Sequence, residues 1–197
     1  ILSNNFPDFL KQAIVTPILK DKNKSTDALQ NYRPVSNLPF LAKVVERVLY
    51  EQIENFIESN KLHSKYQSAY RKNNSCETAV LRMAEDIQKC IFNKKYVALI
   101  MLDSSCAFDT INHEILLTKL TKHFNFSENS VKLLESYLQN RYFSVVINEA
   151  VSKPKLLSNG VPQGSLLGPL LYILYTKEIE YLAQNFEINI MTYADDI

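Results

Sequence analysis

Three acidic residues lie where two apolar stretches end, and they are the side chains best suited to chemistry. Asp103 follows the apolar stretch 96–102, and Asp195 and Asp196 follow the alternating stretch 188–193. Neighbouring carboxylates repel one another unless a cation lies between them. Their oxygens suit Mg²⁺, which takes one or two protein carboxylates together with substrate phosphates. If the two stretches are neighbouring strands, the three acids can hold two ions and stabilise a phosphoryl transfer.

The acidic pair alone also fits a simple turn, because Asp is common in turns. That interpretation leaves the glycines unexplained, since the chain has only three and all lie between residues 160 and 168. Glycine is needed where φ is positive or where the backbone approaches another group closely. A helix-entry turn accounts for part of this pattern. Together with Asp103, the cluster indicates a specialised loop.

The composition is that of a folded globular protein. The chain has 197 residues, 46% hydrophobic and 22% charged, with a net charge of +1. It can therefore form a core without disulfides, and extensive disorder is excluded. The three widely spaced cysteines exclude a disulfide framework and a CxxC zinc site and favour a reducing compartment. The sequence shows no signal peptide and no apolar run long enough to span a membrane, and the near-neutral charge does not by itself indicate nucleic-acid binding.

Helices and strands alternate without a regular β–α–β order, which predicts an α+β fold with helices packed on one face of a largely antiparallel sheet. Periodicity predicts strands at 12–19, 96–102, 143–148, 155–157 and 188–193, and helices at 40–59, 76–91, 113–123, 128–140 and 166–184. Ser75 is expected to cap the second helix, which should bury a stripe from Ala79 to Ile91. The stretch 96–102 is expected to be buried on both faces.

Six segments resemble, in order, the motifs of reverse transcriptases from non-LTR retrotransposons, in particular jockey-like long interspersed elements. They are NYRPVS (31–36), QSAYR (67–71), LDSSCAFD (102–109, motif A), SYLQNR (136–141), GVPQGSLLGP (160–169, motif B) and YADD (193–196, motif C). The resemblance runs from about residue 6 to the end of the chain. Cys106 and the Ala69–Tyr70 pair depart from the family's commoner residues.

The resemblance implies a right-handed polymerase with a fingers region at 1–95 and a palm region at 96–197. The palm would be an antiparallel sheet with helices on one face, truncated after the YADD turn, with no thumb. The implied activity is RNA-directed DNA synthesis by a mobile element, from dNTPs onto a primer 3′ hydroxyl. The implied partners are an RNA template, a DNA primer or target and dNTPs, with no membrane. Because the chain stops one residue past motif C, we expect this fragment alone to be weakly active or inactive.

The resemblance also assigns residues. Asp103, Asp195 and Asp196 would be the catalytic acids and, with the Ser104 carbonyl, would bind two Mg²⁺ ions, or Mn²⁺ in their place. Nucleotide contacts are implied for Phe108, Arg71, Gln163 and Gly164, and template contacts for Arg33, Arg71, Gly160 and Pro162. Phe108 would exclude a ribose 2′ hydroxyl.

Simpler interpretations stay open for several of these residues. Phe108 also fits a core aromatic, and Arg33 and Arg71 fit surface arginines. Asp109 is expected to cap the following helix and not to bind metal.

Two other functions remain open. One is a catalytically silent RNA-binding module like a maturase. The presence of all three acids argues against it, because a protein that only binds RNA does not need them. The other is an RNA-dependent RNA polymerase, against which Phe108 argues. An intracellular, nuclear location follows from the resemblance alone, since this sequence carries no targeting signal.

Overall fold

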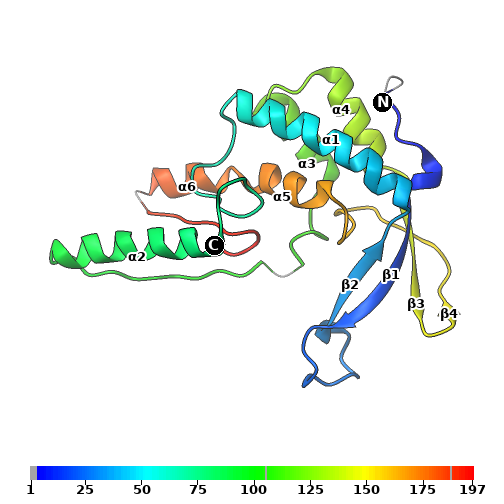
Figure 1. The fold of residues 1–197 in the computed structure, drawn as a ribbon, viewed down its shortest axis with the longest axis horizontal. Coiled ribbons are helices and arrows are strands. Elements are labelled where there is room, and N and C mark those ends of the chain that lie inside the picture. The colour runs from blue at the N-terminus through cyan, green and yellow to red at the C-terminus, as the bar shows by residue number, and fades with distance from the viewer. Residues whose placement is uncertain (1–3, 105, 187) are drawn as a thin grey trace.

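The sheet is built on β1 (Gln12–Leu19), whose alternate residues Ala13 and Val15 are buried. This computed structural model describes residues 4–104, 106–186 and 188–197. β1 pairs antiparallel with β2 (Tyr32–Asn37) and parallel with β3 (Tyr142–Ile147). β3 also pairs antiparallel with two short strands, β4 (Ala150–Val151) and β5 (Lys155–Leu156). The predicted hairpin is confirmed, and the β1–β3 pairing makes the sheet mixed (Figure 1).

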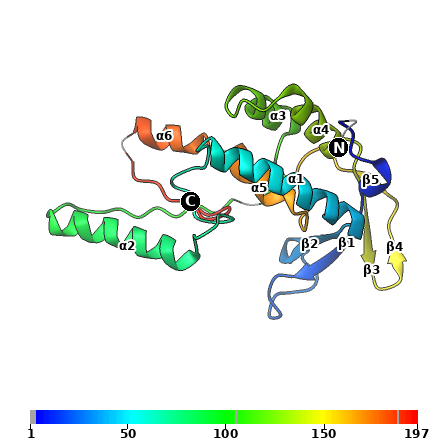
Figure 2. The ribbon, with the colours of Figure 1, turned by 45° about the horizontal axis from the view of Figure 1, so that its top comes forward.

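Four helices supply most of the hydrophobic core. They are α1 (Phe40–Ser59), α3 (His113–Lys122), α4 (Glu128–Leu138) and α5 (Leu167–Thr176). The side chains of Asn112 and Ser127 cap α3 and α4 by accepting from backbone N–H groups of the first turn. Two 3₁₀ turns, η1 (Asp8–Leu10) and η2 (Leu29–Asn31), precede β1 and β2. The predicted α+β class is confirmed. Figure 2 shows α1 lying across α5, with one end of α1 beside the sheet.

The helix predicted at 166–184 is two helices in the structure, α5 and α6 (Ile179–Asn185). The break lies at Lys177 and Glu178. Lys177 Nζ donates to the Leu62 carbonyl at 2.6 Å. The Glu178 carboxylate pairs with Lys119 Nζ at 2.8 Å. These contacts with two other segments favour a turn at this point over a continuous helix.

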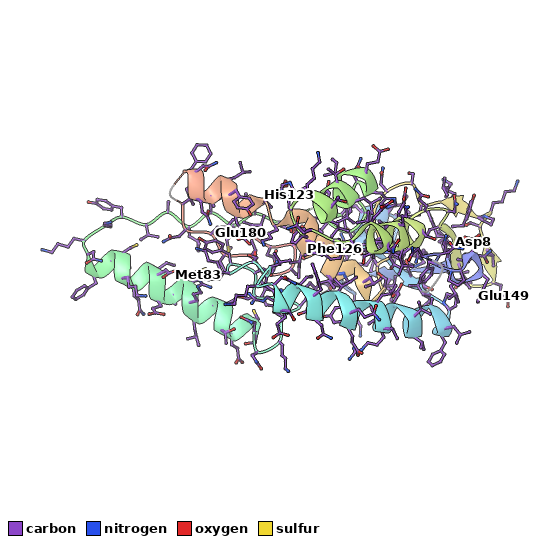
Figure 3. The ribbon with its side chains drawn as sticks, turned by 90° about the horizontal axis from the view of Figure 1, so that it is seen from above. Asp8, Met83, His123, Phe126, Glu149 and Glu180 are labelled. Atoms are coloured by element: carbon purple, nitrogen blue, oxygen red, sulfur yellow. The ribbon has the colours of Figure 1, made fainter. Side chains whose placement is uncertain are left out.

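Helix α2 (Cys76–Phe92) begins at the predicted cap, where Ser75 Oγ accepts from the Thr78 N–H at 3.2 Å. The prediction that it buries an apolar stripe is wrong. Ala79 is buried, but Val80 and Ile91 are 50% and 62% exposed. Figures 1 and 2 show α2 projecting from the body with the extended segment after it running alongside, and Figure 3 marks Met83 on this projecting helix. The stripe is only partly covered because α2 contributes nothing to the shared core among the described residues.

The stretches 96–102 and 188–193 are not regular strands, contrary to the prediction. The first is extended, and Tyr96 and Ile100 are exposed rather than buried. A strand requires a paired neighbour along its length. In the described chain, the only residue of the stretch 96–102 that is paired with another segment is Leu102, which pairs with Ile197. The expected antiparallel palm sheet is therefore represented here by isolated bridges. Among the described residues, no helix is long and apolar enough to cross a membrane.

Candidate active site

Motif A and motif C meet at Asp103 and Asp196. The two residues form an antiparallel bridge, and beside it Leu102 and Ile197 exchange backbone hydrogen bonds of 2.6 and 2.9 Å. Residues directly opposite in such a pairing carry side chains on the same face, with Cβ atoms roughly 4.5–5.5 Å apart. The structure thus brings together two of the three predicted acids.

The third acid, Asp195, lies in a tight turn. Tyr193 and Asp196 exchange backbone hydrogen bonds of 2.9 and 3.0 Å, which confirms the predicted turn. Ala194, at its tip, has a φ of +57°, a value that residues with a Cβ rarely adopt. Asp195 and Asp196 are therefore both held in the backbone of this turn.

Two tyrosines lie near Asp195. Burial raises the pKa of the Tyr172 phenol, its hydrogen bond with Ser104 lowers it, and the charge of Asp195 raises it further. Burial likewise raises the pKa of Tyr70, and the nearby Asp195 adds to that rise. Both phenols are therefore neutral hydroxyls at physiological pH, available as donors beside the acids.

Phe108 belongs to motif A and packs against the core. Its ring lies 5.4 Å from that of Tyr172, tilted by 49°, and it contacts the hydrophobic core. Its backbone carbonyl accepts from the Val161 N–H at 2.9 Å. Motif A is thus joined directly to the motif B loop, and Phe108 is half-buried rather than enclosed.

Two glycines of motif B are required by close backbone approach. Gly160 has a φ of +78°, and a Cβ there would lie 2.6 Å from the Phe108 carbonyl oxygen. Gly164 has a φ of +125°, and a Cβ there would lie 2.6 Å from the Ser36 carbonyl oxygen. The Ser36 N–H also donates to the Gln163 carbonyl at 2.7 Å. The specialised loop inferred from the glycines thus lies between motif A and β2.

Asp109 does not cap the following helix, contrary to the prediction. Asn112 is the cap, and the Asp109 carboxylate accepts from Gln163 Nε2 at 2.9 Å. Although the residue as a whole is exposed, partial desolvation of its carboxylate raises its pKa, and the Gln163 hydrogen bond opposes that rise. The amide of Gln163 is therefore oriented by motif A.

The basic residues behave differently from one another. Arg33 is exposed on β2. Arg71 Nη1 donates to the carbonyls of Ser64 and Gln67 at 2.6 and 3.2 Å, so it closes its own loop. Pro162 is buried within the motif B loop, where its carbonyl accepts from the Ser165 N–H at 3.0 Å.

Sequence reasoning missed Glu46, a fully buried acid of α1. Its carboxylate accepts from the Tyr137 hydroxyl at 2.9 Å and from the Leu166 N–H of motif B at 2.7 Å. Burial raises its pKa, which these hydrogen bonds and nearby Arg141 oppose. The sequence signal for its burial was its position four residues after Ala42, on the apolar stripe of α1.

It also missed Gln67, whose amide contacts the turn of motif C. The side chain is 3% exposed and exchanges hydrogen bonds with the backbone of Ala194. The sequence placed this residue in a fingers motif and gave it no role.

The three acids are a donor set of the kind that hard divalent cations prefer. In residues 4–104, 106–186 and 188–197, however, no group of three or more His, Cys, Asp or Glu side chains is arranged around one point. The backbone bridge brings Asp103 and Asp196 together, but the three carboxylates do not surround one common point. Their chemistry and their shared location fit a metal ion, and the ligand assignment stays a prediction.

Comparison with known proteins gives the same family as the motifs. The reverse transcriptase (RNA-dependent DNA polymerase) family model matches residues 19–197. The chain is 32% identical over 197 residues to a probable RNA-directed DNA polymerase from transposon BS of Drosophila melanogaster, covering 98% of this chain and 21% of that protein. It is 33% identical over 198 residues to the RNA-directed DNA polymerase from mobile element jockey of Drosophila funebris, with the same coverage. The chain thus spans about a fifth of the length of these curated relatives.

The fold has a counterpart among solved structures. An apo telomerase from Candida tropicalis, truncated from its C-terminal domain, superposes with a TM-score of 0.62 at 16% identity, over 95% of this chain and 43% of that one. That likeness concerns the fold, and it fits the fingers-palm arrangement. Reverse transcriptases bind a nucleic-acid template and primer and generally use divalent metal ions. The family model and both relatives match nearly all of this chain, and the chain therefore belongs to the reverse transcriptase family.

Proposed function

We propose that this chain is the catalytic part of an RNA-directed DNA polymerase of a mobile element. The observation that carries the proposal is the bridge between Asp103 and Asp196, which joins motif A to motif C. The reaction is attack of a primer 3′ hydroxyl on the α-phosphate of a dNTP, which forms a phosphodiester bond and releases pyrophosphate. The template is RNA, and the primer is an end in the target DNA.

The acids would bind two Mg²⁺ ions, with Mn²⁺ as a substitute. Asp103, Asp195, Asp196 and the Ser104 carbonyl are the proposed ligands. The bound ions would neutralise the charge that develops on the attacking and leaving oxygens. The chain itself supplies positioning, because the turn and the bridge fix the backbone that carries the carboxylates before substrate binds.

The nucleotide would lie between motif A and the motif B loop. Phe108 is proposed to contact the sugar, and Gln163 and Gly164 to border the base. Gln163 is suited to this because Asp109 orients its amide. Arg33, exposed on β2, is proposed to contact the template phosphates, which provide most nucleic-acid affinity. Arg71 is proposed to contact the nucleotide and the template while bracing its own loop.

Gly160 and Pro162 would shape the template side of the loop. Residues 1–95 are proposed as the fingers and residues 96–197 as the palm, although the hydrophobic core is shared between them. A nuclear site of action is proposed with the activity, since the target is chromosomal DNA.

Primer extension by the full-length protein tests the proposal. With an RNA template, a DNA primer, dNTPs and MgCl₂, we expect Asp195→Asn to reduce synthesis by about 10²-fold or more. Asp27→Asn is the matched control, because Asp27 is exposed in a loop before β2. Template binding without any synthesis by the wild-type protein would instead support a silent RNA-binding module.

A further inference from the structure

The side-chain amide of Gln67 is fitted to the turn that carries the acids. Nε2 donates to the Ala194 carbonyl at 3.3 Å, and Oε1 accepts from the Ala194 N–H at 3.1 Å. Oε1 also accepts from the Ala69 N–H at 2.9 Å. One amide therefore pairs with both polar groups of the residue that separates Tyr193 from Asp195.

The surroundings of Gln67 hold it in place. The Ser64 hydroxyl accepts from the Gln67 N–H at 3.1 Å, and Arg71 closes the loop through the Gln67 carbonyl at 3.2 Å. The Thr192 N–H donates to the Tyr66 carbonyl, and the Ser68 N–H donates to the Thr192 carbonyl, each at 3.0 Å. The amide thus acts from a braced loop that is already paired with the segment leading into the turn.

Only a side-chain amide meets these requirements. A carboxylate has no donor for the Ala194 carbonyl, and an apolar side chain of similar size offers neither donor nor acceptor. Gln67 is 3% exposed, so water does not readily replace lost hydrogen bonds. Without the amide, the two Tyr193–Asp196 backbone hydrogen bonds of the turn are left to oppose relaxation of Ala194 from its φ of +57°.

We propose that Gln67 is a positioning residue for the acids of motif C. It holds the Ala194 peptide in the left-handed conformation and thereby fixes the direction of the Asp195 carboxylate relative to Asp103. This inference rests on the proposed function, because a fixed carboxylate direction matters only if the acids bind metal and substrate. The inference gives the QSAYR motif (67–71), which contributes no metal ligand, a role in positioning the catalytic acids.

Substitution in the full-length protein separates this duty from a general role in folding. Gln67→Leu removes both hydrogen-bonding groups, and Gln67→Glu keeps an acceptor for the Ala194 N–H but places a carboxylate oxygen against the Ala194 carbonyl. Gln52→Leu is the matched control, because Gln52 is exposed on α1. For Gln67→Leu we expect faster hydrogen–deuterium exchange in residues 188–197 and weaker Mn²⁺ binding measured by electron paramagnetic resonance.

The metal concentration for half-maximal synthesis should rise by about tenfold, since displacements of ~1 Å at a catalytic group cost up to ~10²-fold. Gln67→Glu should also raise this metal concentration, because its carboxylate repels the Ala194 carbonyl, and this variant decides the matter if the Leu variant does not fold. A role in folding alone would lower the yield of active protein without moving Mn²⁺ affinity or half-maximal metal.

Unchanged exchange in residues 188–197 together with unchanged metal dependence would overturn the inference. Asp195→Asn, measured in the same series, keeps the two proposals apart. If that variant loses synthesis while Gln67→Leu behaves as wild type, the role of Gln67 fails alone. If Asp195→Asn retains synthesis, the proposed function itself fails.

Discussion

Asp103 and Asp196 face each other across an antiparallel bridge, although they belong to motifs that are distant in the sequence. Paired Cα atoms in such a bridge are about 4.5–5.5 Å apart. Asp195 is one peptide further along, and consecutive Cα atoms are about 3.8 Å apart. The Cα atom of Asp195 therefore lies within about 9–10 Å of that of Asp103, a separation that carboxylate side chains can bridge through shared ions.

Removing one charge of the facing pair should stabilise the metal-free protein. Like charges directly opposite are destabilising. We expect Asp103→Asn to raise the apparent Tm of the full-length protein slightly without Mg²⁺, and to abolish the rise in Tm that millimolar MgCl₂ gives the wild type. Thermal unfolding with and without MgCl₂ measures both. An equal rise for wild type and variant would show that Mg²⁺ binds elsewhere.

The glycines of motif B should differ in their tolerance of alanine. Gly160→Ala and Gly164→Ala place a Cβ 2.6 Å from a backbone oxygen at positive φ. We expect each to cost about 1–3 kcal/mol or more and to lower the apparent Tm. Gly168→Ala is the control, because its new Cβ meets first the Ser165 hydroxyl, a side-chain atom, at 2.7 Å. If Gly168→Ala proved the most damaging of the three, the close backbone approach would not be the reason for these glycines.

Shortening Phe108 should relax sugar selectivity. The ring is half-buried against Tyr172, so Phe108→Ala opens space beside motif A. We expect a larger ratio of ribonucleotide to deoxyribonucleotide incorporation by the full-length protein, together with some loss of stability from the lost packing. The ratio is independent of the amount of active enzyme, which separates the two effects. Phe40→Ala, at the exposed start of α1, serves as the control, and an unchanged ratio for Phe108→Ala would remove its assigned role.

Neutralising Glu46 should make stability less dependent on pH. Burial raises the pKa of Glu46 in the folded protein. The stability that its neutral form contributes is complete below the ordinary Glu pKa of about 4.3 and is lost as pH rises through the raised pKa. We therefore expect Glu46→Gln to gain in apparent Tm relative to wild type between mildly acidic and neutral pH. A constant difference across that range would mean that Glu46 does not titrate there.

Local sequence chemistry predicted the helices well. α1, α3 and α4 follow from apolar residues at helical spacing, and the Ser75 cap of α2 follows from its short-range hydrogen bonds. The same pattern did not reveal which stripe would be buried. The apolar face of α2 has the period of a core helix although it is only partly covered, because periodicity shows which residues share a face and not whether another element packs on it.

Contacts between distant segments could not be predicted in this way. The stretch 96–102 is as apolar as a buried strand, but strand formation requires a paired neighbour. The motifs predicted that Asp103 and the YADD turn belong together, and the structure confirms that motif A and motif C meet. The partners that fix the loops, Glu46 beneath Leu166 and Gln67 against Ala194, depend on long-range hydrogen bonds with no local signature.

Metal-directed cleavage tests most directly whether the acids share their ions. Fe²⁺ replaces Mg²⁺ in the full-length protein, and ascorbate with peroxide then generates radicals that cut the backbone beside the bound metal. The account predicts cuts near Asp103 and near Asp195 in the same molecules, both suppressed by excess Mg²⁺ and both lost in Asp103→Asn. Cutting at only one of the two segments, or cuts near Asp195 that persist in Asp103→Asn, would contradict it.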